Sequence, residues 1–132
     1  MARVKPMCPL CERARGGLVV RENASAVAFD DGYPVSRGHT LIVPRRHVAD
    51  LFALSWEEQQ ALWALLPVVK EALDRAHRPA GYNVGVNVGQ AAGQTVAHVH
   101  VHVIPRYDGD VPDPRGGVRW VIPDRADYWS AR

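Results

Sequence analysis

The sequence predicts an α+β fold in which a five-stranded antiparallel sheet packs against one main helix. Three observations lead to this expectation. Short apolar segments follow one another with turn residues between them, a single longer segment has helical periodicity, and strands and helices do not alternate regularly along the 132 residues. Short strands that are adjacent in sequence favour antiparallel pairing, because a hairpin needs only a few connecting residues.

The first three strands are predicted before residue 45. Residues 18–22 and 25–30 flank a tight turn at Asn23 and Ala24, which is the pattern of a β-hairpin. A turn cluster at 31–34 then leads to the β-branched segment 39–44, which has the composition of a buried strand.

One long helix is predicted from Ser55 onward. Ser55 and Glu58 have the spacing of a capping box, in which each side chain binds the other residue's backbone N–H. Pro67 lies within the helical pattern, and we expect it to bend or divide the helix near Leu66, since proline costs about 3 kcal/mol in a helix interior. The apolar positions that follow the cap are Leu62, Leu65, Leu66, Val69 and Leu73.

The last two strands are predicted at 82–88 and from Thr95 through Pro105, on either side of a glycine-containing loop at 89–93. The final strand carries three of the six histidines at every second position. Alternate side chains of a strand share a face, so the histidines are expected to line one face while valines bury the other. The histidines are His98, His100 and His102, and the valines are Val99, Val101 and Val103.

Such a histidine face is suited to chemistry, because imidazole acts as a nucleophile, a proton carrier or a metal ligand near neutral pH. The simpler interpretation is a surface strand whose exposed histidines have no chemical role. A catalytic metal centre built on the three histidines is another, although no Asp or Glu interrupts the strand to complete its ligand shell.

We expect residues 1–132 to form one domain, with its core over about 8–108 and an irregular tail over 109–132. Two prolines and two glycines between Asp110 and Trp120 favour irregular structure there. The formal net charge is only +2 and both signs are scattered, which argues against nucleic-acid and membrane partners. The start of the chain lacks the apolar core of a signal peptide, and we expect a cytoplasmic protein.

The only two cysteines form the sequence Cys8-Pro9-Leu10-Cys11. A reducing cytoplasm argues against a structural disulfide, which leaves a metal site or a redox pair. Because zinc takes four ligands in a structural site, two more ligands would have to come from elsewhere in the chain.

The segment from His98 to Ile104 resembles the H-φ-H-φ-H-φ-φ signature of the histidine-triad (HIT) superfamily of nucleotide hydrolases and transferases, where φ is apolar. The similarity covers roughly residues 8–108. Its other matching features are Gly38-His39, the basic segment 44–47, Asn87 and Gly93-Gln94-Thr95.

The resemblance implies that His100 is the nucleophile, attacking the α-phosphate of a nucleotide to form a nucleotidyl-histidine that water or phosphate then cleaves. It implies that a backbone carbonyl holds the other ring nitrogen of His100, and that His102 binds the non-bridging phosphate oxygens. His39 would position the active histidines, although a satisfied core histidine is equally plausible.

The remaining binding residues are also assigned by resemblance. Gln94 and Thr95 correspond to residues that contact the scissile bridge and the phosphate, and Asn87 would help to hold the phosphate. Asp31 corresponds to a position used on the ribose hydroxyls. Each of these residues could instead be a polar group of a turn or a sheet edge.

Some members of the superfamily join an N-terminal C-x-x-C pair to two histidines in a closed Cys2His2 zinc site. By that resemblance, Cys8, Cys11, His47 and His98 would hold a structural Zn²⁺, and the alternative is a reduced cysteine pair without metal.

The implied function is cleavage of nucleoside 5′-phosphate derivatives, either dinucleoside polyphosphates such as diadenosine tetraphosphate or adenosine 5′-phosphoramidates, with release of AMP. The alternative is a non-catalytic protein that binds or senses purine nucleotides. The resemblance also implies a two-fold homodimer whose two sheets join into one of ten strands, with Trp63 either in that interface or in the core of the chain.

Overall fold

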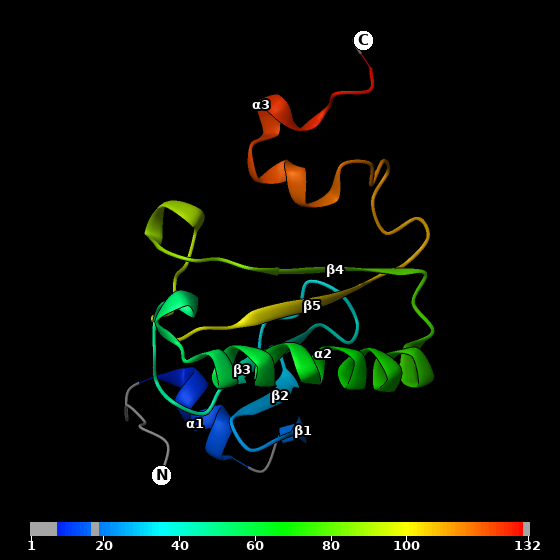
Figure 1. Cartoon of the computed structure of the whole chain (residues 1–132). Coiled ribbons are helices and arrows are strands. Elements are labelled where there is room, and N and C mark those ends of the chain that lie inside the picture. Colours follow the sequence, from blue (N-terminus) through cyan, green and yellow to red (C-terminus); the bar gives the residue numbers. More distant parts are fainter. Residues whose placement is uncertain (1–7, 17–18, 131–132) are drawn as a thin grey trace.

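The structure, a computed structural model, describes residues 8–16 and 19–130. Its core is an α+β arrangement of a five-stranded antiparallel sheet and one long helix, α2 (Trp56–His77), as expected from the sequence (Figure 1). The strands are β1 (Val19–Glu22), β2 (Ala26–Asp30), β3 (Thr40–Pro44), β4 (Gly81–Val86) and β5 (Val101–Arg106). The short helices are α1 (Pro9–Arg15), η1 (Leu51–Ala53), η2 (Gln90–Ala92), η3 (Gly117–Val121) and α3 (Pro123–Ala126).

The strand order is β1-β2-β3-β5-β4, with every neighbouring pair antiparallel. The last strand of the sequence therefore lies inside the sheet, between β3 and β4. In this register His102 of β5 lies opposite Leu41 of β3 and Gly85 of β4. β4 is left as an edge strand of the sheet.

The two faces of the sheet are buried by different helices. α2 covers one face, where Ile42 and Val103 join the buried leucines of the helix. α1 packs on the opposite face, where its Leu10 and Cys11 meet Phe29 and other side chains of β2 and β3. Because alternate residues of a strand point to opposite faces, both helices draw on the same strands for their cores.

α2 begins as the sequence predicts, with a capping box between Ser55 and Glu58. The expected division at Pro67 does not occur, since α2 runs uninterrupted for 22 residues. Pro67 is exposed, while Leu65 and Val69 on either side of it are buried against the sheet. Packing of one continuous apolar face offsets the backbone hydrogen bond that the proline removes.

The expected strand bounds need correction around the histidines. Only His102 lies in β5, which begins at Val101, and the predicted fourth strand ends at Val86 rather than 88. The segment before β5 leaves the sheet because the N–H of Val99 donates to the carbonyl of Val48, in the loop after β3. The predicted first strand began at Leu18, which lies outside the described residues.

α1 was not predicted. The sequence Cys-Pro-Leu-Cys starts a helix because the Cys8 sulfur accepts a hydrogen bond from the Cys11 N–H and Pro9 occupies the first helical position. The buried residues Leu10 and Ala14, four positions apart, then face the sheet.

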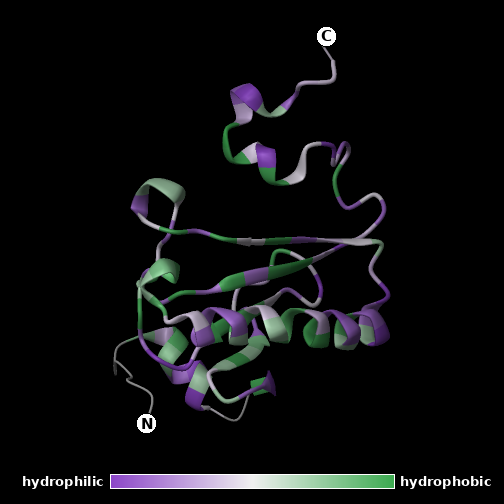
Figure 2. Cartoon of the chain, viewed as in Figure 1, coloured by the Kyte–Doolittle hydropathy of each residue, from purple (hydrophilic) through white to green (hydrophobic). Residues whose placement is uncertain are grey.

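The segment after residue 108 is less irregular than expected, because it contains η3 and α3. The Arg119 guanidinium links the two by donating to the carbonyl of Ala126, and it lies over the Tyr128 ring. Figures 1 and 2 show this segment extending beyond β4, with apolar residues along part of its length. Among the described residues, no helix has the length and apolar character that crossing a membrane requires.

The start of α2 is tied to the loop after β3 by an ion pair. The Arg46 guanidinium donates two hydrogen bonds to the Glu58 carboxylate, at 2.8 and 2.7 Å. Because Glu58 also accepts a hydrogen bond from the N–H of Ser55, one carboxylate fixes both the helix cap and the loop. These hydrogen bonds lower the pKa of Glu58 to about 2.

We expect Glu58→Gln to lower the free energy of unfolding by about 1 to 2 kcal/mol at pH 7, since a charge-assisted pair that is partly exposed is lost. The native carboxylate has the lower pKa in the folded state, so its contribution is present above the unfolded pKa and disappears as pH falls toward about 2. Urea unfolding of both proteins from pH 7 to pH 2 measures this difference. Glu57→Gln, which makes the same charge change in the same turn, is the control, and a pH-independent difference for Glu58→Gln would contradict the assignment.

Candidate functional site

A cavity of about 650 Å³ lies on the α1 face of the sheet, at the start of β5. α1 forms one wall and the loop between β2 and β3 another. The predicted site residues that line it are Asp31, Asn87, Thr95, His100 and His102. Residues that the sequence analysis did not assign also line it, among them Leu10, Arg13 and Tyr33.

His100 is held in one orientation by the backbone. Its Nδ1 lies 2.8 Å from the carbonyl oxygen of His98, so Nδ1 carries the proton and donates it to that carbonyl. The Nε2 lone pair is therefore available on a side chain that lines the cavity. The ring is almost buried, at 8% exposure, which limits its rotation. This is the tautomer that a nucleophilic imidazole needs.

His102 is oriented by a chain of hydrogen bonds through His39. The Val35 N–H donates to Nδ1 of His39, so the proton of His39 is on Nε2. That Nε2 lies 2.9 Å from Nδ1 of His102 and 3.4 Å from the Asp31 carboxylate. The shorter contact makes His102 Nδ1 the acceptor. Nε2 of His102 then carries a proton and is a hydrogen-bond donor for a ligand in the cavity.

Burial keeps these rings neutral. Desolvation lowers the pKa of both His39 and His102, and the neighbouring His100 lowers that of His102 further. Asp31 opposes the shift in both cases without cancelling it. At neutral pH the two rings therefore act as directed hydrogen-bond donors rather than as cations.

Gln94 does not line the cavity. Its side-chain amide is used within the loop that precedes the histidines: the oxygen accepts from the Gly89 N–H, and the nitrogen donates to the carbonyls of Ala49 and Val96. The neighbouring Thr95 and Gly93 do reach the cavity. In this structure Gln94 shapes the loop that carries them.

The predicted Cys2His2 set is assembled behind the cavity. Cys8 Sγ lies 3.6 Å from His98 Nδ1, and Cys11 Sγ lies 3.4 Å from the same nitrogen and 3.3 Å from His47 Nδ1. The two Nδ1 atoms are 3.3 Å apart. Zinc–ligand bonds of about 2.3 Å to sulfur and about 2.0 Å to nitrogen in a tetrahedron put S···N at roughly 3.5 Å and N···N at roughly 3.3 Å. The four side chains therefore have the spacing of a zinc site.

The hydrogen bonding of His98 also fits a metal ligand. Its Nε2 lies 2.9 Å from the carbonyl oxygen of Pro44 and donates to it, which leaves the Nδ1 lone pair directed at the two sulfurs. The ring is fully buried and points away from the cavity. As expected, the alternating valines pack on the α2 side, and the three histidines lie on the α1 side of the sheet. Only His100 and His102 line the cavity, whereas the His98 ring lies against the two cysteines.

Comparison with known proteins agrees with this geometry. A family model described as the HIT domain matches residues 15–109, which is most of the chain and includes every histidine described above. The chain belongs to the HIT family. The match begins at the end of α1, so the cysteine pair lies outside the matched residues.

Two HIT relatives have names that state an activity. The AP-4-A phosphorylase of Mycobacterium tuberculosis is 40% identical over 95 residues, covering 71% of this chain and 49% of that protein. The adenosine 5′-monophosphoramidase of Schizosaccharomyces pombe is 37% identical over 102 residues, covering 75% of this chain and 74% of that protein. This chain spans about half the length of the mycobacterial enzyme.

A zinc-bound histidine triad family protein from Mycobacterium smegmatis has a similar solved structure, with a TM-score of 0.71 and 31% identity. The match covers 81% of this chain and 84% of that one. The α+β HIT fold of this chain, with five antiparallel strands and one main helix, is thus that of its family.

The wall formed by α1 is the part of the site that the sequence analysis missed. Leu10 and Arg13 line the cavity because Cys8 and Cys11 fix the helix against the sheet. The four-residue spacing of Leu10 and Ala14 was the available signal, but seven residues are too few for periodicity alone to identify a helix.

Proposed function

We propose that this HIT protein is a nucleotide hydrolase or transferase that cleaves a nucleoside 5′-phosphate derivative at its α-phosphate through a nucleotidyl-histidine on His100. The observation that carries the proposal is the free Nε2 of His100, fixed by the 2.8 Å contact between Nδ1 and the His98 carbonyl, at a cavity large enough for a nucleotide. The nucleoside would lie beside α1, with its ribose hydroxyls at Asp31.

In the first step Nε2 of His100 forms a bond to the α-phosphorus while the bond from phosphorus to the leaving group breaks, and the leaving group takes up a proton. The carbonyl of His98 stabilises the positive charge that develops on the ring through the proton on Nδ1. In the second step water attacks the same phosphorus, the P–N bond breaks, and AMP is released with His100 neutral again.

His102 stabilises the charge that develops on the non-bridging oxygens, because its Nε2–H is aligned in advance by His39. Asn87 and Thr95 line the same cavity and would hold the phosphate. We assign Gln94 an indirect role, in which it shapes the loop bearing Thr95.

Phosphate can replace water in the second step, which would give ADP instead of AMP. The name of one relative, a phosphorylase, supports phosphate as a possible acceptor, and the name of the other, a phosphoramidase, supports testing a substrate with a P–N bond as well as an anhydride. Comparing the products formed with and without added inorganic phosphate identifies the acceptor, since water gives AMP and phosphate gives ADP.

His100→Ala is expected to reduce AMP release from adenosine 5′-phosphoramidate and from diadenosine tetraphosphate at least about a thousandfold, because the step that forms the covalent intermediate is lost. Nucleotide chromatography measures the products, and intact mass after a quench without acid detects the adenylyl adduct on the native protein alone. His77→Ala, at the end of α2 and outside both histidine clusters, is the matched control.

If the native protein binds AMP but forms neither product nor adduct with either substrate, the hydrolase proposal is wrong for these substrates. The chain would then be a nucleotide-binding or sensing protein, which is the alternative function for the same cavity.

We further propose that Cys8, Cys11, His47 and His98 hold a structural Zn²⁺. The S···N and N···N spacings support this, as does the zinc-bound relative of known structure. When bound, the ion would contribute folding free energy by joining α1 to the segment before β5. The four protein ligands leave no position for a substrate, so catalysis remains with His100 and His102.

The native protein is expected to carry one zinc per chain, and the double substitution Cys8→Ser and Cys11→Ser is expected to carry none and to lower Tm by at least about 5 °C. Elemental analysis and thermal unfolding measure the two effects, with His77→Ala as the control. A native protein without zinc, whose Tm does not respond to added Zn²⁺, would contradict the proposal.

We also propose that two chains pair through β4 into a homodimer with a ten-stranded sheet. Within the described residues β4 pairs with only one strand of the sheet, β5, and Trp63 of α2 is 41% exposed rather than part of the core.

Sedimentation velocity is expected to give a dimer for the native protein and a larger monomer fraction for Trp63→Glu, because a buried charge would disfavour the interface. Val20→Glu adds the same charge to β1, at the opposite edge of the sheet, and should leave the dimer intact. A monomeric native protein at micromolar concentration would refute the pairing.

A further inference from the structure

α1 covers only part of the second face of the sheet. It packs on β1 and β2 and shares its core with side chains of β3, while the outward residues of β5 and β4 lie beyond it. His102, Ile104 and Arg106 alternate with buried residues along β5 and are only half-buried. A strip of the sheet therefore leads from the catalytic histidines toward the end of β5.

This strip is hollowed along its length. A depression of about 440 Å³ shares His102 and Asn87 with the cavity described above. A second depression of about 600 Å³ shares Val35, Asn83 and Ile104 with the first. Because the two depressions share lining residues, we treat them as one groove and call it the strand groove.

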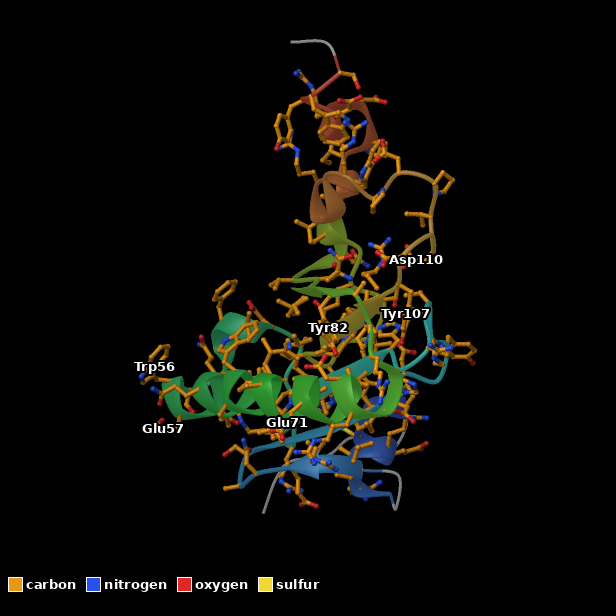
Figure 3. The ribbon with its side chains drawn as sticks, turned by 90° about the vertical axis from the view of Figure 1, so that its right-hand side faces the viewer. Trp56, Glu57, Glu71, Tyr82, Tyr107 and Asp110 are labelled. Atoms are coloured by element: carbon orange, nitrogen blue, oxygen red, sulfur yellow. The ribbon has the colours of Figure 1, made fainter. Side chains whose placement is uncertain are left out.

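The strand groove is long enough for more than a small leaving group. At about 3.3 Å per residue, β5 spans roughly 13 Å between His102 and Arg106. The loop that carries Val35 and Arg37 borders the far end of the groove, and Val118 of η3 borders the middle. In Figure 3, Tyr107 and Asp110 lie between the sheet and the C-terminal segment, at this far end.

The charged side chains that line the far end of the groove do not balance. The Arg106 guanidinium donates two hydrogen bonds to Asp110 and one to the Asn83 side chain, so its charge is compensated. The Arg37 guanidinium lies over the Tyr107 ring at 4.8 Å, and none of the ion pairs among the described residues involves it. Two guanidinium groups and one carboxylate therefore give the far end a net charge of +1.

The backbone holds Arg37 at this position. The Tyr107 hydroxyl donates to the Arg37 carbonyl at 2.6 Å, and the neighbouring Ser36 hydroxyl donates to the Pro105 carbonyl at 2.7 Å. These contacts join the loop to the end of β5. The cation is thus presented to the groove by a loop that two hydrogen bonds fix to the sheet.

We infer that the strand groove is the subsite for the leaving group, and that Arg37 selects leaving groups that carry negative charge, such as a nucleoside polyphosphate. The inference rests on the proposed function, which places the reacting phosphorus beside His102. His102 lines both the cavity beside α1 and the strand groove. The nucleoside lies on the α1 side of this point and the leaving group on the β4–β5 side. An ammonia leaving group is too small to reach Arg37, and an ammonium-bearing one is repelled by it.

The test compares two substrates that share the AMP moiety and differ in the leaving group. We expect Arg37→Gln to lower kcat/KM for diadenosine tetraphosphate, relative to kcat/KM for adenosine 5′-phosphoramidate, by about tenfold, since a charge-assisted contact is lost. Arg37→Lys keeps the charge and should restore part of this ratio. The effect should shrink at about 1 M salt, where screening acts within about 3 Å.

Arg21→Gln is the matched control, because it removes the same charge from an exposed side chain of β1, at the opposite edge of the sheet. Its ratio should equal that of the native protein. A native protein that cleaves both substrates, with the same ratio in Arg37→Gln, overturns the strand groove as the leaving-group subsite. A native protein that cleaves the phosphoramidate alone also overturns it, whereas cleavage of neither substrate is a failure of the proposed function itself.

Discussion

The site is organised around His98, which contacts the cysteine pair through its side chain and the His100 ring through its backbone carbonyl. Its ring faces the two cysteine sulfurs and is fixed by the Pro44 carbonyl, while its own carbonyl fixes the ring of His100. The same residue thus sets the position of α1 and the tautomer of the candidate nucleophile. The His98 imidazole is fully buried and both of its nitrogens have partners, so the ring has little freedom to move. Its fixed position also fixes the His98 carbonyl, which binds the His100 ring.

A second chain of contacts reaches His102 from the other side of the cavity. It starts at the backbone N–H of Val35, passes through His39, and ends on the nitrogen of His102 that faces away from the ligand. Each histidine in the cavity therefore receives its orientation from a backbone group, directly or through one neighbour. Neutral rings suit this arrangement, because a protonated His39 would lose the acceptor that the Val35 N–H requires.

The sheet and the long helix could be predicted because their signals are local: apolar, β-branched composition in β3, hydrophobic alternation in β5 and a capping box at the start of α2. The histidine spacing likewise indicated a reactive centre. Local signals could not reveal that the strand begins only at Val101, because the earlier departure from the sheet depends on the contact between Val99 and Val48, far apart in the chain. Pro67 does not divide α2, because packing on the sheet outweighs its local cost. Gln94 has a side chain that fits either a ligand or a loop, and only the fold decides between them.

On the α1 face of the sheet, the cavity beside α1 and the strand groove differ in how far their residues can be substituted without affecting the histidines. The part of the site that we propose for the nucleoside is formed by α1, whose cysteines contact His98 and, through it, His100, so a change there would disturb the proposed chemistry as well as binding. The strand groove is built on β4, the end of β5 and the loop of Arg37, and none of these holds a side chain of the Cys2His2 set. Val35 of this loop orients His39, so only groove side chains that stand apart from the histidines, such as Arg37 over the Tyr107 ring, could change the leaving group that we propose for this groove without disturbing the histidine geometry.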